Sequence, residues 1–572
     1  MGAPVASRFA ALAFDYDGTL TQSDRLSTTV LSHLRAQRED GTRLVLVTGR
    51  ILAELRHAAP GVEEEFDAVV AENGAVLVDQ DGVRDLATPI DPELARALTH
   101  RDVSVRAGRV VLAGRGRDAA TALEEIGRLG LDCQLVRNRS ELMILPSGIS
   151  KGTGLMEALA ELGVSRHSTL AVGDAENDLP LLAVAEVGVA VANAVDSLKR
   201  TADVVLEGAD GDGVVELLTG PVVSGAHRVL PRRRRLVLGH RSDGNPVSVA
   251  ATPHELLITG ASGAGKSFLV GLLVERLVQQ QYGVLVIDRE GDHAVLAARR
   301  GLLVLDGASG LPAPAEVVTL FAHRFASLIV DVSLLTSEEQ DAYTAELLPL
   351  VIAHQLATGS PQWVVLDEAH ALTDHPAGGP PRGTGHILAT HLPDQLPTAV
   401  RERIDTVIVL PGAGDGADQV RCTVEQLHPR GGELMGLVEG LRRGQGALVS
   451  TSGGAPVAFQ LDERFTRHVR HWHKYTDAQL PDHLRFRFGH GGCEGTAANV
   501  REFHRGLRRV SPEALATHLL HRDLSRWVRE VLSDEQLGAA VADTEYAVRD
   551  GIEDVESARL VLLHEVEEHF LA

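Results

Sequence analysis

Aromatic residues and cysteines are scarce in this chain of 572 residues. Phe, Trp and Tyr together make up only 3% of it, so the sequence offers few aromatic side chains on which nucleic-acid bases could stack. The 3 cysteines, Cys133, Cys422 and Cys493, lie far apart and form no CxxC pair. This spacing argues against a disulfide scaffold and against a thiolate zinc site.

Long hydrophobic runs and excess positive charge are lacking as well. No stretch approaches the ~20 apolar residues that span a bilayer, and carboxylates interrupt the apolar run near the first residues. Acidic residues outnumber basic ones by 78 to 55, which gives a formal net charge of −23. A surface of this sign repels phosphate backbones as a whole, so composition gives nucleic-acid binding no support. We expect a cytoplasmic protein that contacts no membrane.

The chain is long enough for three or four domains. Short apolar runs alternate with amphipathic helical stretches, a pattern typical of parallel α/β sheets. We expect two Rossmann-like parallel-sheet domains and a mainly helical C-terminal domain. The predicted boundaries are residues 1–220 with a cap at about 80–145, a linker at 221–235, a second sheet domain at 236–460 and the helical domain at 461–572.

The expected strands fall into two sets. We expect the cap to consist of strands flanking one helix, and we interpret the basic run 232–235 as a solvated linker. The predicted strands are ALAF (11–14), LVLVT (44–48), AVVAE (68–72) and TLAVGD (169–174) in the first set, and ELLITG (255–260), VLVID (284–288), SLIVDV (327–332), WVVLD (363–367), HILAT (386–390) and TVIVL (406–410) in the second.

Two aspartates follow the first predicted strand. In ALAFDYDGTL the apolar run leads directly into Asp15, and Asp17 lies two positions later. Residues two apart on an extended segment face the same way, and open α/β sheets bind ligands beyond the carboxyl ends of their strands. Two carboxylates this close repel each other, and a divalent cation with oxygen ligands removes the conflict. The sequence therefore predicts a Mg²⁺ site here.

Four segments of the chain resemble, in order, the four motifs of the haloacid dehalogenase superfamily. They are DYDGTL, LVLVTGR, the lysine of ISKGTGL, and VGDAENDLP. The segment AENGA at 71–75 and a cap between the second and third motifs are similar to the Cof-type, or IIB, branch. Members of that branch are phosphatases of sugar phosphates and phosphoglycolate. The resemblance covers residues 8–218 and implies a Mg²⁺-dependent phosphatase of a small phosphate monoester.

The resemblance also implies a role for each matching residue. Asp15 would attack phosphorus and form an aspartyl-phosphate, while Asp17 would protonate the leaving oxygen and then activate water. Thr48 would hydrogen-bond the transferring phosphoryl group, and Lys151 would neutralise its oxygens. The expected Mg²⁺ ligands are Asp15, Asp17 through its backbone carbonyl, Asp174 and Asp178.

Substrate contacts are a separate expectation. For Glu72 and Asn73, capping of a turn is the alternative role. Four arginines of the cap could select an anionic substrate or could be exposed loop residues. The predicted substrate residues are Gly49, Glu72, Asn73 and Asn177, and the cap arginines are Arg106, Arg109, Arg115 and Arg117.

A second site is expected in ITGASGAGKSFLV, which fits the pattern G-x-x-x-x-G-K-[ST] between an apolar strand and an amphipathic helix. The backbone amides of such a loop and the helix N-terminus cradle phosphate. Asp367 in WVVLDEAH would hold the water shell of a Mg²⁺, and Glu368 would polarise the attacking water. The residues expected to bind ATP with its Mg²⁺ are Gly260, Gly263, Gly265, Lys266, Ser267 and Asp367.

Residues 236–460 resemble the HerA/FtsK-type ATPases through this loop, VIDREGDH, DEAH and the ILAT strand. The chain departs from that family in having His391 where Gln usually follows the strand, and in a short segment between DEAH and ILAT. The resemblance implies nucleotide binding, and it leaves undecided whether the chain forms a hexameric DNA-pumping ring. Candidates for an arginine that serves a neighbouring subunit are Arg382, Arg401 and Arg403.

Three functions remain open from the sequence. The leading one is a phosphatase of a small phosphorylated metabolite that the ATP-binding domain regulates or assembles, in a possible homo-oligomer. The second is a nucleic-acid end-processing phosphatase/kinase or a HerA-like DNA-associated ATPase, and the third is a nucleotide-gated scaffold. The helical end of the chain is expected to be an interaction or regulatory module, with His468, His471 and His473 on a polar helix face rather than at a metal.

Overall fold

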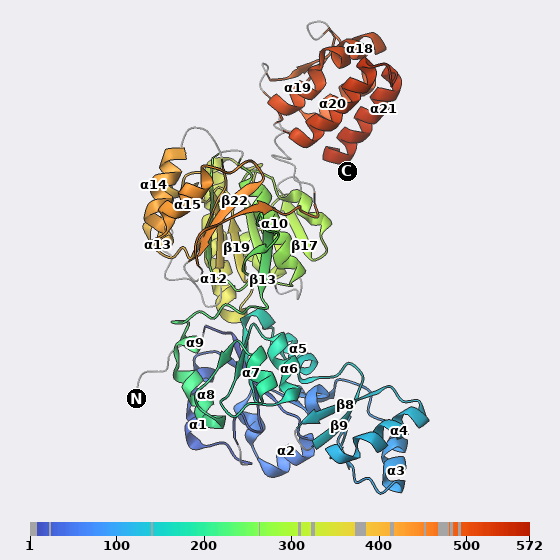
Figure 1. Cartoon of the computed structure of the whole chain (residues 1–572), viewed down its shortest axis with the longest axis vertical. Helices are drawn as coiled ribbons and strands as arrows, with labels where there is room; N and C mark the ends of the chain where they lie inside the picture. The colour runs from blue at the N-terminus through green and yellow to red at the C-terminus, as the bar shows by residue number, and fades with distance from the viewer. Residues whose placement is uncertain are drawn as a thin grey trace.

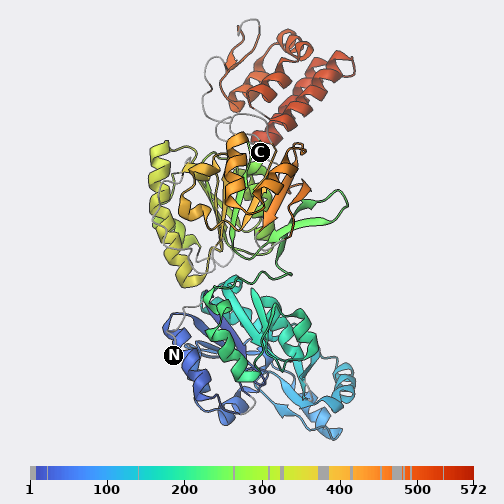
Figure 2. The same ribbon diagram turned by 60° about the vertical axis from the view of Figure 1, so that its left-hand side comes forward.

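The computed structural model describes residues 8–21, 24–138, 141–261, 264–306, 310–321, 327–371, 385–411, 417–450, 454–466, 480, 484–489, 493–532 and 534–571. Gly263, Arg382 and the three histidines at 468, 471 and 473 lie outside these residues. Two large sheets and a helical bundle follow one another along the long axis of the molecule (Figures 1 and 2). The predicted fold class, α/β with two Rossmann-like sheets and a mainly helical C-terminal part, is confirmed.

The first sheet has 8 strands in the order β12-β11-β10-β1-β2-β3-β4-β5. All five residues of β1 are buried, because parallel neighbours pair with it on both sides and helices cover its faces. The strands are β1 (Ala11–Asp15), β2 (Arg43–Val47), β3 (Ala68–Ala71), β4 (Val76–Asp79), β5 (Gly82–Asp85), β10 (Thr169–Gly173), β11 (Val187–Ala190) and β12 (Val204–Val205). The helices are α1 (Thr28–Glu39), α2 (Leu52–Ala58), α5 (Lys151–Glu161), α6 (Leu179–Val184), α7 (Asp196–Thr201), α8 (Asp210–Thr219) and α9 (Pro221–Ser224).

The cap is a four-stranded antiparallel sheet, in the order β6-β7-β9-β8, with two helices packed against one face (Figure 1). The prediction of one helix was wrong, because α3 also buries Leu94 and Leu98 against this sheet. The strand β5, at the start of the predicted cap, pairs with β4 and extends the main sheet instead. The cap elements are β6 (Arg106–Ala107), β7 (Leu112–Arg115), β8 (Cys133–Asn138), β9 (Glu141–Pro146), α3 (Pro92–His100) and α4 (Ala119–Leu129).

The second sheet has 11 strands in the order β14-β13-β23-β22-β21-β15-β20-β19-β16-β18-β17, with β15 near its centre. Apolar clusters cover both of its faces. The strands are β13 (Arg235–His240), β14 (Pro246–Ala250), β15 (Glu255–Thr259), β16 (Val284–Asp288), β17 (Leu302–Asp306), β18 (Ser327–Asp331), β19 (Trp363–Leu366), β20 (Gly385–Thr390), β21 (Thr406–Val409), β22 (Gln445–Ser450) and β23 (Val457–Leu461). The helices are α10 (Lys266–Gln279), α11 (Pro314–Leu320), α12 (Ser337–Thr358), α13 (Thr398–Arg401), α14 (Ala417–Leu427) and α15 (Gly431–Val438).

The C-terminal part is a helical bundle around its own apolar cluster, which includes Phe503 and Trp527. A short antiparallel ladder, β24 (Phe486–Arg487) with β25 (Thr496–Ala497), packs beside it. No helix in the described residues is both long enough and apolar enough to span a bilayer. The helices are α17 (Val500–Arg509), α18 (Pro512–His521), α19 (Asp523–Glu530), α20 (Glu535–Arg549) and α21 (Val555–Val566).

The buried carboxylate of Glu186 joins the first sheet to the second. It accepts hydrogen bonds from the hydroxyls of Tyr282, at 2.8 Å, and Thr252, at 2.5 Å, and lies 2.9 Å from Nδ1 of His167. The rings of His167 and Tyr282 stack with their centroids 3.7 Å apart. A buried charge is stable only when hydrogen-bonded in this way, so the two sheets are fixed to each other at this point.

The basic run before β13 belongs to the same contact region. The guanidinium of Arg233 donates to the backbone carbonyls of Leu182 and Ala185, and that of Arg234 donates to Ala185 as well. Cations at the C-terminal end of a helix complement the helix dipole, and these carbonyls lie at the end of α6. The interpretation of this run as a solvated linker was therefore wrong for these two residues.

Candidate active site

Asp15 and Lys151 form the centre of the first site. Asp15 is the last residue of β1, and Lys151 is the first residue of α5, whose N-terminus is closed by a capping box between Ser150 and Thr153. The ammonium of Lys151 donates to Oδ1 of Asp15 and to Oδ1 of Asp178, both at 2.5 Å. All three side chains are buried, so this cation is held between two carboxylates away from water.

The loop after β10 supplies the remaining carboxylates. Oδ2 of Asp178 accepts the backbone amides of Asp174 and Ala175, each at 2.9 Å. Gly173 is required here, because a Cβ at that position would lie 2.6 Å from the Cβ of Asp178. Oxygen atoms of Asp15, Asp174 and Asp178 all lie within 4.8 Å of one another. The structure thus brings together these three predicted metal ligands.

Burial and neighbouring charge shift the ionisation of this cluster. Burial, and then the Asp178 carboxylate, raise the pKa of Asp15 well above its ordinary value, although Lys151 opposes them. Burial lowers the pKa of Lys151, but the two carboxylates outweigh it, and the net pKa is raised. The lysine therefore stays protonated, and the cluster retains an excess of negative charge whenever its carboxylates are ionised.

Asp17 is placed differently from Asp15. Its side chain is 46% exposed and accepts two hydrogen bonds from the guanidinium of Arg50, at 2.8 and 2.5 Å. The Asp17 carboxylate is not in the carboxylate cluster around Asp15. Arg50 also pairs with Asp24 at 2.9 Å. Arg50 ends the motif LVLVTGR, but no role is predicted for it, because its partner Asp17 lies 33 residues away in the chain.

Thr48 and Gly49 follow β2, whose last residue, Val47, pairs with Asp15 of β1. Thr48 is fully buried, and its hydroxyl accepts the backbone amide of Arg50 at 3.1 Å. Gly49 lines a cavity of about 600 Å³ together with Asp15, Asp17 and Arg50. The same cavity is lined on the cap side by Arg106, Glu141 and Met143. A space of this size between the core and the cap accommodates a small substrate.

Glu72 and Asn73 both have left-handed backbone conformations, with φ of 53° and 58°. The buried carboxylate of Glu72 accepts the cap amides of Arg109 and Val110, each at 2.9 Å, and that of Val111 at 3.3 Å. These contacts favour the turn-capping role for Glu72 over contact with substrate. Asn73 accepts a hydrogen bond at 3.1 Å from the side-chain amide of Asn177, so these two predicted residues are in contact.

Of the four cap arginines, only Arg106 lines the cavity. It pairs with Glu54 of α2 at 3.3 Å and with Glu141 of β9 at 2.5 Å. Arg109 pairs with Asp85 of β5 at 2.7 Å, outside the cavity. Arg115 and Arg117 are likewise absent from its lining, and both are exposed, although Arg115 is the last residue of β7 rather than a loop residue.

The expected phosphate-binding loop connects β15 to α10. Gly265 has φ of 100° and forms the N-cap of α10, so the helix begins at Lys266. The Lys266 ammonium donates to the carbonyls of Gly260, at 3.3 Å, and Ala261, at 3.2 Å. Gly260 tolerates no side chain, because a Cβ there would lie 2.5 Å from the carbonyl oxygen of Leu410.

Asp367 and Glu368 lie at the carboxyl end of β19. Oδ2 of Asp367 lies 2.9 Å from Nε2 of His293, a buried residue that the sequence did not single out. Burial raises the pKa of Asp367, but hydrogen bonds from His293 and Ser267 outweigh it, so the net pKa is lowered. The expected ligand Asp367 is thus in contact with Ser267 of the phosphate-binding loop.

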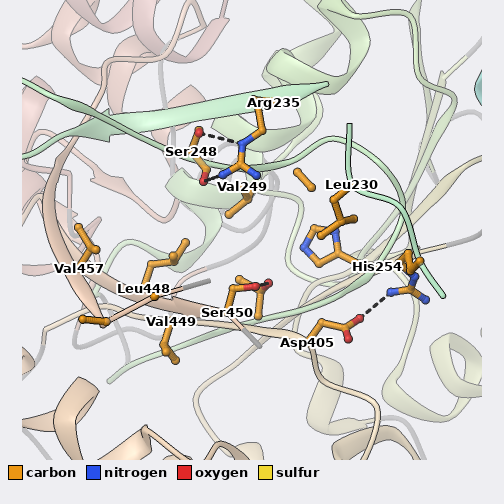
Figure 3. Close-up of a pocket in the computed structure, with 15 residues that line it drawn as sticks. Leu230, Arg235, Ser248, Val249, His254, Asp405, Leu448, Val449, Ser450 and Val457 are labelled. Carbon is orange, nitrogen blue, oxygen red and sulfur yellow. Dashed lines mark hydrogen bonds and ion pairs between the residues drawn. The ribbon is translucent and has the colours of Figure 1, made fainter. Parts of the chain in front are cut away.

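Figure 3 shows a further cavity, of about 430 Å³, beside the second sheet. Arg228 donates to Asp405 at 2.6 Å, and Arg235 donates to the hydroxyl of Ser248 at 3.1 Å. The described residues that line this cavity include none of those predicted for either site. It is therefore separate from both candidate sites.

Comparison with known proteins matches two separate parts of the chain to two different families. Residues 12–102 and 132–218 match the family model of the haloacid dehalogenase-like hydrolases. Residues 245–375 match the model of the helicase HerA central domain. Phosphoglycolate phosphatase 2 of Saccharolobus solfataricus is 31% identical over 227 residues, which are 37% of this chain and 93% of that protein.

Two further similarities concern the same part of the chain. The phosphoglycolate phosphatase of Methanothermobacter thermautotrophicus is 32% identical over 212 residues, 36% of this chain and 96% of that protein. A solved haloacid dehalogenase-like hydrolase from Bacteroides thetaiotaomicron shares 23% identity with a TM-score of 0.32, over 37% of this chain and 98% of that one. The chain belongs to the haloacid dehalogenase-like phosphatases, and it carries a HerA-like P-loop domain on the same polypeptide.

Proposed function

We propose that the first part of the chain is a Mg²⁺-dependent phosphatase that hydrolyses a small phosphate monoester through an aspartyl-phosphate on Asp15. The observation that carries this proposal is the contact of the Asp15 carboxylate with Lys151 at 2.5 Å, beside a cavity between core and cap. An anionic nucleophile next to a buried ammonium suits attack on a phosphoryl group, whose oxygens the same ammonium can neutralise.

The carboxylate cluster fits a divalent cation. Asp15, Asp174 and Asp178 bring three carboxylates together, and Lys151 is the cation in contact with two of them. A Mg²⁺ ion complements the excess negative charge and prefers these oxygen ligands. When bound, it would supply positive charge to the phosphoryl oxygens.

The proposed reaction uses Asp15 and Asp17 in turn. A carboxylate oxygen of Asp15 forms a bond to phosphorus as the ester P–O bond breaks, and Asp17 gives its proton to the leaving oxygen. Water then attacks phosphorus and gives a proton to Asp17, which releases phosphate and restores the Asp15 carboxylate. The two hydrogen bonds from Arg50 orient Asp17 beside the cavity.

The size of the cavity suits a small substrate, and Arg50 and Arg106 bring two guanidinium groups to its lining that can contact an anionic one. The same lining holds four carboxylates, those of Asp15, Asp17, Glu54 and Glu141, which the two arginines balance only in part. Curated relatives over this region are named phosphoglycolate phosphatases. We propose a small phosphorylated acid of this kind as the substrate.

We propose that the HerA-like part binds and hydrolyses ATP with Mg²⁺ and thereby regulates the phosphatase. Asp178 is the N-cap of α6, and Glu186 follows the end of this helix. Lys266 begins α10, and Tyr282 follows the end of that helix. Each site thus lies at the start of a helix whose far end leads to the contact between Glu186 and Tyr282. This arrangement gives a physical route by which one site can affect the other.

A panel of small phosphate esters, assayed with Mg²⁺ and with or without ATP, tests these proposals. We expect wild-type protein to release phosphate and Asp15→Asn to lose this activity. ATP should change the turnover of the wild type and leave that of Lys266→Ala unchanged. Equal activity of Asp15→Asn and wild type would refute the phosphatase mechanism. Indifference of the wild type to ATP would refute the regulation alone.

The match to the helicase HerA central domain favours action on nucleic acid. The second candidate is therefore an enzyme that processes nucleic-acid ends or a DNA-associated ATPase. The net charge of −23 opposes it. Release of phosphate from a 3′-phosphorylated oligonucleotide, at a rate above that from the small esters, would favour this candidate over the first.

A further inference from the structure

Two histidines and a glutamate, side-chain types that bind metals in many proteins, meet at one edge of the second sheet, outside the phosphatase. Oε2 of Glu368 lies 3.1 Å from Nδ1 of His370 and 3.1 Å from Nδ1 of His391. The two imidazole rings meet edge to face, with centroids 4.8 Å apart. All three side chains are half-buried, so their donor atoms remain reachable from solvent.

The topology of the sheet explains why these residues meet. The strands β19 and β20 are parallel neighbours, with Leu366 opposite Leu388, so their carboxyl ends lie at the same edge. His391 is the first residue after β20, and Glu368 follows β19 by two residues. Glu368 has φ of 53°, in the left-handed region that non-glycine residues seldom adopt. Such a conformation persists only where the surroundings hold it. Here the backbone amide of Glu368 donates to Oδ1 of Asp367 at 3.1 Å, and both histidines contact its carboxylate.

The chemistry of the set is that of a transition-metal site. Two imidazole nitrogens and one carboxylate oxygen suit Zn²⁺ and similar ions, whereas Mg²⁺ prefers oxygen ligands alone. With zinc–ligand distances of about 2.0–2.2 Å, the donors of a tetrahedral site lie roughly 3.3–3.6 Å apart. The observed separations of 3.1 Å from the carboxylate oxygen to each nitrogen are slightly shorter than this range. Three protein ligands also leave a fourth position open for water.

We propose that Glu368, His370 and His391 form a binding site for a transition-metal dication of the Zn²⁺ type. Binding of the ion uses the lone pairs of Glu368 and both imidazoles, and it needs no nucleotide. The bound ion should inhibit ATP hydrolysis, because it occupies Glu368, the residue expected to polarise the attacking water. This consequence rests on the proposed ATP hydrolysis. The site is distinct from the carboxylate cluster at Asp15, which offers oxygen atoms only.

The test is a calorimetric titration of chelator-treated full-length protein with Zn²⁺, in the presence of excess Mg²⁺. The informative variant is His391→Gln, because its amide can still donate a hydrogen bond to Glu368 but is a poor ligand for zinc. Loss of an outer-shell partner alone costs 10–100-fold in metal affinity, so loss of this direct ligand should weaken Zn²⁺ binding by at least about 100-fold. The matched control is His386→Gln, within the strand β20 that His391 follows, since His386 lies 3.0 Å from Glu255 and outside the cluster.

Absorption of the Co²⁺-substituted protein gives a second readout. We expect the intense visible bands of a four-coordinate site in the wild type and in His386→Gln, and their loss in His391→Gln. Equal Zn²⁺ affinity of the wild type and His391→Gln would overturn the proposal and would mean that the histidines only donate hydrogen bonds to Glu368. A protein that binds Zn²⁺ but hydrolyses no ATP even in its zinc-free form would refute the proposed ATPase and leave the metal site standing.

Discussion

The hydroxyl of Tyr282 donates a hydrogen bond, 2.8 Å long, to the carboxylate of Glu186 across the contact between the two sheets. Both side chains are buried. Burial, and then the charge of Glu186, raise the pKa of Tyr282, so the hydroxyl remains a donor at every physiological pH. The contact therefore depends on a hydrogen bond to a buried charge, which is costly to remove.

Tyr282→Phe should destabilise the protein by about 1.5–3 kcal/mol, the range for a hydrogen bond to a charged group. The substitution keeps the ring that stacks on His167 and removes only the hydroxyl. Chemical unfolding followed by circular dichroism measures the effect. Tyr343→Phe is the matched control, because the hydroxyl of Tyr343 donates to the neutral carbonyl of Pro312 at a half-buried position. Equal losses in the two variants would contradict the assigned importance of the Glu186 contact.

Glu72→Gln should disturb the position of the cap. The carboxylate of Glu72 now accepts hydrogen bonds from three backbone N–H groups of the cap. The NH₂ group of a glutamine cannot accept, so one or more of these N–H groups would lose its acceptor, which destabilises the fold by about 1–3 kcal/mol. We expect KM to rise more than kcat falls, since the cap forms one wall of the cavity. Steady-state kinetics on the best ester measures this. Glu63→Gln, which removes an exposed pair with Arg56, should leave both constants unchanged.

The sequence predicts those parts of the fold that a local pattern specifies. Buried parallel strands such as β1, β15 and β19 each contain an apolar run, and a motif residue ends the strand or directly follows it. The edge strand β17 escaped prediction because only its first residue is buried, so its pattern is weak. Helix α3 was missed although Asp91 and Pro92 mark its start, a signal that was available in the sequence.

Site residues within local motifs could be predicted, whereas their partners from distant segments could not. Asp15, Lys151 and Asp174 are recognisable because each lies in a motif. The partners Arg50 and His293 were not assigned, because their contacts to Asp17 and Asp367 join segments 33 and 74 residues apart. The hydrogen bonds of Glu72 to the cap are also long-range, so no pattern around residue 72 could distinguish a substrate ligand from a cap anchor.

Lys151→Met should abolish phosphatase activity and also destabilise the fold. Removal of one partner from a buried ion pair typically costs about 3–5 kcal/mol, because it leaves uncompensated charge. Here both Asp15 and Asp178 lose their shared partner. The double variant Lys151→Met with Asp178→Asn should recover part of the stability and none of the activity. A single variant as stable as the wild type, by chemical unfolding, would show that Lys151 is not the charge that balances this cluster.

Protons and Mg²⁺ should compete for Asp15. Burial and the Asp178 carboxylate raise the pKa of Asp15 well above its ordinary value, so the carboxyl becomes protonated at a higher pH than an exposed aspartate does. Below that pKa, each unit of pH should weaken Mg²⁺ binding by about tenfold, because the ligand must first lose its proton. Activity should therefore fall on acidification, and added Mg²⁺ should move the midpoint of that fall to lower pH.

Profiles of kcat/KM against pH at several Mg²⁺ concentrations measure this competition. Circular dichroism at each pH serves as the control, because partial unfolding in acid would lower activity without responding to Mg²⁺ in this way. A midpoint that stays fixed over the whole range of Mg²⁺ would mean that the titrating group does not share its oxygen atoms with the metal. That result would separate the nucleophile from the metal site and contradict the proposed role of Asp15 in both.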